Sequence, residues 1–146
     1  MVGWVSRTIV GATVRMPKWF VRWVSRRYVA GPELSDAVEI MKRLSGEGTC
    51  FTIDVLGEEI TSMDEAQFFY DEYVRVIEAI HAGQFDANLS IKPTAFGLLI
   101  DRDKGMDNIR KLVELASKND MFVLLEMEDH RDTTDTIQVV KDLHSE

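Results

Sequence analysis

Three charged side chains fall where predicted strands end, a position that binds ligands in folds built from alternating strands and helices. They are an acid, a lysine and a second acid: Asp54, Lys92 and Glu126. Charges at such a place are unfavourable unless they pair with one another or bind a ligand. The lysine could hold a carboxylate or lie against an anionic cofactor. It could equally belong to a structural network of lysine and carboxylates, and the residue types leave both readings open.

The alternation of side chains along a strand predicts which residues share a face. If the most apolar residues face the helices, the opposite face carries Thr52 and Asp54, then Asn88, Ser90 and Lys92, then Phe122, Leu124 and Glu126. The carboxyl ends of parallel strands lie at one end of a sheet or barrel. We therefore expect the two acids and the lysine to meet at the mouth of one cavity.

The elements that would position these residues alternate along the chain. We expect strands at 50–56, 87–92 and 122–127, and helices at 64–82, at 105–118 and from about Thr133 onward. The strand starts, near 50, 87 and 121, are 37 and 34 residues apart, which is typical of βα units on a parallel sheet. A doubly wound sheet and a (β/α)8 barrel both fit. A complete barrel needs roughly 250 residues, so we expect a fragment or one part of a larger assembly.

The N-terminal region differs in charge from the rest. Residues 1–48 are predicted to form a helical arm, with helices at 3–15, 18–29 and 33–45, ahead of the βα units at 49–146. Residues 1–31 carry six basic residues and no acid. Since the whole chain has a net charge of −8, the remainder carries −14. This acidic remainder argues against nucleic-acid binding.

All three tryptophans lie in the arm, beside its basic residues. That composition is typical of a helix on an anionic membrane surface. Tryptophans that cover the barrel or a partner subunit explain it as well. A single cysteine, Cys50, and the absence of a long apolar run indicate a reducing, cytoplasmic setting, with membrane association through the arm as an alternative. No metal site is expected, because the acids and histidine at 126–130 alternate in direction.

At the strand ends the chain resembles the proline dehydrogenase family of FAD-dependent enzymes. Four segments carry the resemblance: Tyr28-Val29-Ala30-Gly31 with the helix after it, Thr52 to Glu58 (TIDVLGE), Asp86 to Thr94 (DANLSIKPT), and Phe122 to Asp129 (FVLLEMED) with the helix after it. Their order and spacing hold over nearly all of residues 28–146. Together the strand-end motifs are fairly specific, whereas any one of them alone would be weak.

The resemblance implies a partial (β/α)8 barrel, the first three βα units, with FAD at the strand ends. Such enzymes oxidise L-proline to 1-pyrroline-5-carboxylate and pass the electrons to a quinone. By position, Lys92 would hold the proline carboxylate, and Met127 and Asp54 would contact the flavin. Glu126 would be the catalytic residue. It is a glutamate where the family usually has an aspartate, and the extra methylene matters for a positioned group.

Other family features are not found in residues 1–146. These are the later strands with an Arg and a Val-Lys-Gly-Ala-Tyr-type segment, and the last helix with its Tyr and Arg-Arg pair. We therefore expect the chain alone to be inactive unless a C-terminal half or an oligomer completes it. Two alternatives stay open: a non-catalytic module that binds a membrane or a partner through the arm, and another barrel enzyme whose lysine binds a phosphate or sugar acid.

Overall fold

The computed structural model describes residues 17, 20, 31, 33–57, 60–127 and 133–145, and the chain forms two compact units, 1–40 and 41–146. The helices and strands are α3 (Leu34–Ser45), β1 (Phe51–Asp54), α4 (Met63–Gly83), β2 (Ala87–Ile91), the 3-10 helix η1 (Pro93–Phe96), α5 (Arg102–Lys118), β3 (Val123–Leu125) and α6 (Thr133–Ser145). The helices predicted at 3–15 and 18–29, and the three tryptophans, fall almost entirely outside the described residues. The predicted domain boundary at residue 48 stays a prediction.

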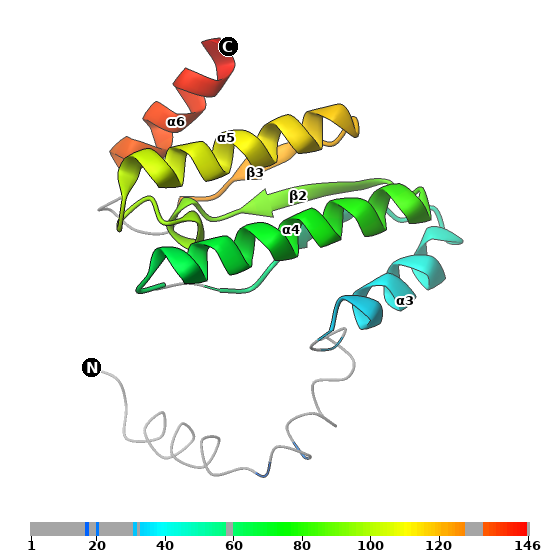
Figure 1. The fold of residues 1–146 in the computed structure, drawn as a ribbon. Helices are drawn as coiled ribbons and strands as arrows, with labels where there is room; N and C mark the ends of the chain where they lie inside the picture. The colour runs from blue at the N-terminus through cyan, green and yellow to red at the C-terminus, as the bar shows by residue number, and fades with distance from the viewer. Residues whose placement is uncertain are drawn as a thin grey trace, which may run out of the picture. The chain divides into compact units, whose positions relative to one another are not determined.

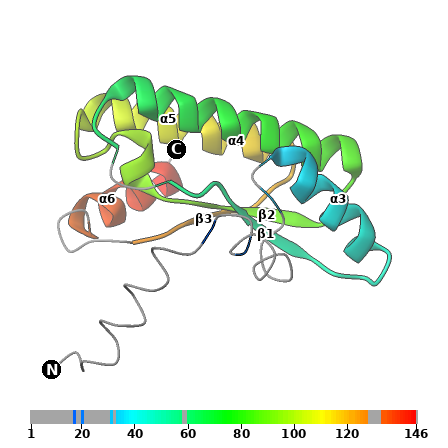
Figure 2. The ribbon, with the colours of Figure 1, turned by 90° about the horizontal axis from the view of Figure 1, so that it is seen from below.

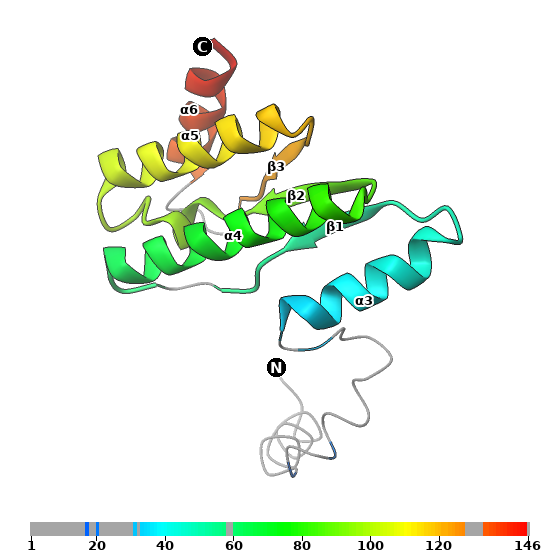
Figure 3. The same ribbon diagram turned by 45° about the vertical axis from the view of Figure 1, so that its right-hand side comes forward.

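The three strands form one parallel sheet in the order β1-β2-β3, as Figure 3 shows; Figure 1 shows β2 and β3 with the helices α4 and α5. α4 and α5 lie along the same face of this sheet (Figure 2). The layer between the sheet and these two helices is mainly apolar. It contains Leu89, Ile91, Ile77, Ile80, Ile109 and Leu112, each at most 2% exposed. The alternating strands and helices, and the parallel pairing, are therefore confirmed. Parallel pairing brings the carboxyl ends of all three strands to one end of the sheet.

Two helices begin where side chains satisfy their first backbone N–H groups. Ser62 and Glu65 form a reciprocal capping box that starts α4, and Asp101 accepts a hydrogen bond from Lys104 N and starts α5 three residues earlier than predicted. The backbone N–H of Thr61 donates to the Glu65 carboxylate and holds its pKa below the ordinary value. The caps fix where each helix begins relative to the strand before it.

The chain after β2 makes one turn of 3-10 helix that the sequence patterns do not predict. Lys92 is the residue before this helix, and Pro93 occupies its first position, where a missing N–H costs nothing. Gly97 ends it with φ of 91°, a conformation that glycine adopts readily. The turn buries Phe96 completely, 5.4 Å from the ring of Tyr73 in α4. This packing holds the segment that follows Lys92.

The last helix leaves two of its apolar residues uncovered. Ile137 and Val140 of α6 are 44% and 48% exposed, whereas Val139 and Thr136 are buried. α6 follows β3, and within the part of the chain that the structure describes β3 is hydrogen-bonded to a strand on one side only. The sheet therefore offers α6 less surface than it offers α4 and α5. None of the described helices is both long and apolar enough to cross a bilayer.

Gly105 allows α5 to pack closely on the loop that precedes it. A Cβ at this position would lie 2.7 Å from the backbone nitrogen and 2.8 Å from the Cα of Leu98. Glycine to alanine normally stabilises a helix by up to about 1 kcal/mol, but here we expect Gly105→Ala to lower the free energy of unfolding by about 1–3 kcal/mol, because backbone must move. Urea titration followed by circular dichroism measures it.

Gly46→Ala is the matched control, since its Cβ would make only an ordinary contact, 3.6 Å from the Arg43 carbonyl. We expect a change within about 0.5 kcal/mol for this substitution. Equal effects of the two alanine substitutions would contradict the close approach at Gly105.

Candidate functional site

The predicted meeting of two acids and a lysine occurs at the carboxyl ends of the strands. Lys92 Nζ lies 2.6 Å from Asp54 Oδ2 and 3.6 Å from Glu126 Oε2. Asp54 is the last residue of β1, Lys92 follows β2 directly, and Glu126 follows β3 directly. The backbone N–H of Glu126 donates to Ile91 O at 2.9 Å, which holds this residue beside β2 beyond the end of β3.

The lysine is the most deeply placed member of this ion cluster, which we define as Asp54, Lys92 and Glu126. Its side chain is 9% exposed, against 25% for Asp54 and 41% for Glu126. The cluster therefore opens to solvent on the Glu126 side. One cation between two carboxylates leaves a net charge of −1. Such an arrangement suits a zwitterion, whose carboxylate can reach the ammonium and whose amine can reach an acid.

Two more residues close the ion cluster into a ring. Ser90 Oγ donates a hydrogen bond to Glu126 Oε1, and the Tyr73 hydroxyl lies 3.1 Å from Asp54 Oδ1 and 2.7 Å from the Ser90 carbonyl oxygen. The contacts thus run from Tyr73 to Asp54, Lys92, Glu126 and Ser90, and back to Tyr73. Because the members come from three strands and from α4, the ring fixes the strand ends relative to one another.

Ser90 and Tyr73 were not predicted as site residues, although the sequence pattern gave an indication for Ser90. Ser90 lies on the predicted inward face, and its 1% exposure makes its hydroxyl a buried polar group that needs a partner. Tyr73 falls in the apolar stripe of its helix, so its position in the sequence indicates only a core residue. Its side chain crosses from the helix layer to the end of the sheet, and only the packing shows this.

The predicted inward face is otherwise uncovered in the part of the chain that the structure describes. Thr52 and Asn88 are exposed, and Phe122 and Leu124 are 64% and 45% exposed. Met127, one residue beyond Glu126, is 60% exposed. Exposed apolar side chains therefore lie on β3 and in the residues directly next to it, close in the chain to Glu126. Glu58, Glu128, Asp129 and His130 lie outside the described residues, and the predictions on them stay predictions.

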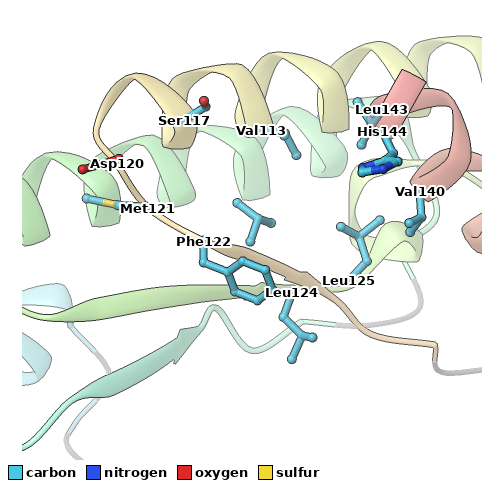
Figure 4. Close-up of a pocket in the computed structure, with 11 residues that line it drawn as sticks. Val113, Ser117, Asp120, Met121, Phe122, Leu124, Leu125, Val140, Leu143 and His144 are labelled. Carbon is cyan, nitrogen blue, oxygen red and sulfur yellow. The ribbon is translucent and has the colours of Figure 1, made fainter. Parts of the chain in front are cut away.

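A hollow on the described surface lies away from the ion cluster. It measures about 670 Å³ and lies between α5, α6 and β3. Figure 4 shows Val113, Leu125 and Val140 on its helix side, with Phe122 and Leu124 on the other side of β3. This hollow borders β3, which is one of the two edge strands of the sheet in the described part of the chain. The ion cluster is the better candidate site, because only there do charged groups converge at the strand ends.

Comparison with known proteins assigns the chain to a family. A model of the proline dehydrogenase family matches residues 37–146, which is most of the sequence and includes the whole ion cluster. The chain belongs to the proline dehydrogenase family. The resemblance read from the strand-end motifs is therefore confirmed.

Individual members of the proline dehydrogenase family match over the same region. Proline dehydrogenase 1 of Bacillus subtilis is 34% identical over 122 residues, which are 84% of this chain and 40% of that protein. Proline dehydrogenase of Deinococcus radiodurans is 31% identical over 126 residues, 84% of this chain and 41% of that protein. The chain thus spans about 40% of the length of these relatives.

A solved structure has a similar fold. It is proline utilization A (PutA) from Bdellovibrio bacteriovorus inactivated by N-propargylglycine, with a TM-score of 0.77 and 22% identity. The match covers 95% of this chain and 17% of that chain. At this identity the likeness establishes the arrangement of strands and helices. The chemistry has to be argued from the residues of the site.

Proposed function

We propose that residues 49–146 form the first three βα units of a (β/α)8 barrel that oxidises L-proline to 1-pyrroline-5-carboxylate. The observation that carries this proposal is the ion cluster at the strand ends of a chain from the proline dehydrogenase family. Proline at neutral pH is a zwitterion with one carboxylate and one ammonium. A buried lysine flanked by two acids supplies a complementary charge to each.

Within this proposal each residue has a distinct role. Lys92 binds the proline carboxylate, and Glu126, the most exposed of the three, faces the proline nitrogen as the catalytic residue. Asp54 already contacts Lys92 and Tyr73 through its two oxygens. It therefore suits positioning the lysine better than the direct contact with a cofactor that the family resemblance implies. Met127 remains the candidate for contact with the cofactor.

The cofactor we propose is FAD, and the surroundings of the ion cluster fit its flat ring. Leu124 and Met127, which lie two residues before and one residue after Glu126 in the chain, expose apolar surface. A planar ring with polar edges would cover this apolar surface and form hydrogen bonds near the Glu126 carboxylate. When bound, the flavin would supply the acceptor for the hydride that leaves proline C5 and then pass electrons to a quinone. The chain's own residues hold the substrate carboxylate, orient the ring of proline and balance the charges.

The open edge of β3 supports a larger barrel. A strand of a parallel sheet is ordinarily buried, and β3 pairs with one strand only, β2, among the described residues. Five further βα units would cover Phe122 and Leu124 as part of the barrel interior, which is a packed core in this fold. We therefore propose that activity requires the remaining strands.

A hybrid protein tests the proposed function. Its first part is the segment of this chain that matches Bacillus subtilis proline dehydrogenase 1, and the rest of that relative follows. We expect the hybrid to bind flavin and to reduce a dye when proline is added, whereas residues 1–146 alone do neither. Absorbance of the bound flavin and of the dye measures both.

The hybrid also has an internal control. Glu126→Gln keeps the shape of the side chain and removes its charge, and we expect it to lower the rate of dye reduction on the order of 100-fold while flavin stays bound. A hybrid that holds flavin but is inactive with proline would contradict the proposed function. Stoichiometric flavin and turnover in residues 1–146 alone would contradict the need for further strands.

A further inference from the structure

The hydrogen-bond ladder between β1 and β2 ends in an unusual way. In this parallel pair, Phe51 is the partner of Ala87, and Phe51 N donates to the residue before it, Asp86 O, at 2.9 Å. Donors from β1 recur at every second residue. The register Asp54 to Ser90 then predicts that Val55 N donates to the Ser90 carbonyl.

The Tyr73 hydroxyl takes the place of this last ladder bond. Val55 N donates to the Tyr73 oxygen at 3.2 Å, and the Tyr73 hydroxyl lies 2.7 Å from the Ser90 carbonyl oxygen. A group from the helix layer is thus inserted between the two strands. Strand β1 ends at the residue before, Asp54, and the inserted oxygen holds the two chains apart beyond that point.

Packing around the Tyr73 ring fixes the position of this hydroxyl. Tyr73 has no exposed surface, and its ring packs against the buried ring of Phe96 in η1. Burial raises the pKa of Tyr73 far above its ordinary value, and the neighbouring Asp54 carboxylate adds to the rise, although the Val55 N–H opposes it. The phenol therefore keeps its proton at physiological pH and remains a hydrogen-bond donor.

The same hydroxyl reaches the ion cluster. It lies 3.1 Å from Asp54 Oδ1, while the other oxygen, Asp54 Oδ2, holds Lys92 at 2.6 Å. Each oxygen of the Asp54 carboxylate thus has one partner, the Tyr73 hydroxyl from α4 or the Lys92 ammonium. Rotation of this carboxylate would break one of these contacts, so the hydroxyl, through Asp54, contributes to the position of the lysine ammonium.

We propose that Tyr73 is a positioning residue of the site. It replaces one ladder bond between β1 and β2, separates the strand ends, and orients the Asp54 carboxylate that holds Lys92. That this geometry serves proline binding rests on the proposed function, whereas the positioning itself concerns residues 1–146 alone.

Nuclear magnetic resonance of the whole chain tests the proposal through the variant Tyr73→Phe. This variant keeps the ring on Phe96 and removes only the hydroxyl. We expect the Val55 amide resonance and the Lys92 side-chain ammonium resonance to shift by more than a linewidth. We also expect the Lys92 ammonium protons to exchange with water about tenfold faster, as one charge-assisted hydrogen bond in the ring is lost.

Tyr70→Phe is the matched control, because Tyr70 lies one turn earlier in the same helix and the ring of contacts does not include it. We expect it to leave both resonances in place. If Tyr73→Phe moves neither resonance, or moves only that of Val55, the positioning of Lys92 by Tyr73 is wrong.

A second variant keeps the test valid should Tyr73→Phe fail to fold. Incorporating 3-fluorotyrosine retains the ring and hydroxyl but makes the hydroxyl a stronger donor and a weaker acceptor. Shifts of the Val55 amide and the Lys92 ammonium would support the proposal, and their absence would overturn it. Neither measurement depends on turnover, so an inactive hybrid would remove the proposed function and leave this result unchanged.

Discussion

Replacing Lys92 with methionine is expected to lower the free energy of unfolding of the chain by about 2–3 kcal/mol, because two carboxylates would then face each other without their cation. This loss of stability is smaller than the loss expected for a fully buried ion pair, because Asp54 is 25% and Glu126 41% exposed and solvent screens their charges. Urea titration at neutral pH measures the change. It would be a large fraction of the stability of a domain of this size.

Two further variants show whether charge is the cause. In Lys92→Met combined with Asp54→Asn, one of the two facing charges is gone, and we expect at least half of the lost stability to return. Lys104→Met removes a lysine whose side chain is 69% exposed and paired with Asp101 at 2.9 Å. We expect it to change stability by less than about 0.5 kcal/mol. No recovery in the double variant would mean that packing of the lysine stem matters more than its charge.

The second large effect concerns substrate choice in an active hybrid. Lys92→Met is expected to lower kcat/KM for proline on the order of 100-fold, because the substrate carboxylate loses its cation. Pyrrolidine has the same ring without the carboxylate, so we expect its oxidation to change far less. The ratio of the two substrates within one preparation is independent of the fraction of folded enzyme.

The comparison with pyrrolidine isolates carboxylate binding from general damage to the site. If kcat/KM falls equally for proline and pyrrolidine, Lys92 acts by holding the strand ends together through Asp54 and Glu126. Lys104→Met serves again as control, since Lys104 lies in α5 outside the ion cluster. We expect it to leave the ratio of proline to pyrrolidine unchanged.

Much of the site follows from local sequence. Side chains alternate with a period of two along any strand, so the face of Asp54 and of Lys92 is set once the apolar residues are known. Parallel pairing then brings the strand ends together, and the 37- and 34-residue spacing predicts parallel pairing. The family motifs cover the same residues. These patterns need no knowledge of how the helices pack, which is why they predicted the ion cluster correctly.

Element ends were predicted less well, for reasons that differ between elements. β1 stops at Asp54 because the Tyr73 hydroxyl replaces the next ladder bond, which no pattern in residues 50–56 indicates. The early start of α5 has a local cause, the Asp101 cap. The face that α6 buries depends on how much sheet lies beneath it, and this is a property of the assembled layers.

Alternation and strand order are local or periodic properties, and they were enough to predict which residue types meet at the strand ends. Which atoms are in contact follows from the packing of the strands and helices. The ammonium of Lys92 meets Asp54 more closely than Glu126, and Ser90 and Tyr73 close the ring. These contacts depend on the stagger of the strands and on how deeply α4 places its tyrosine. Both arise from packing between segments that are 17 to 38 residues apart in the chain.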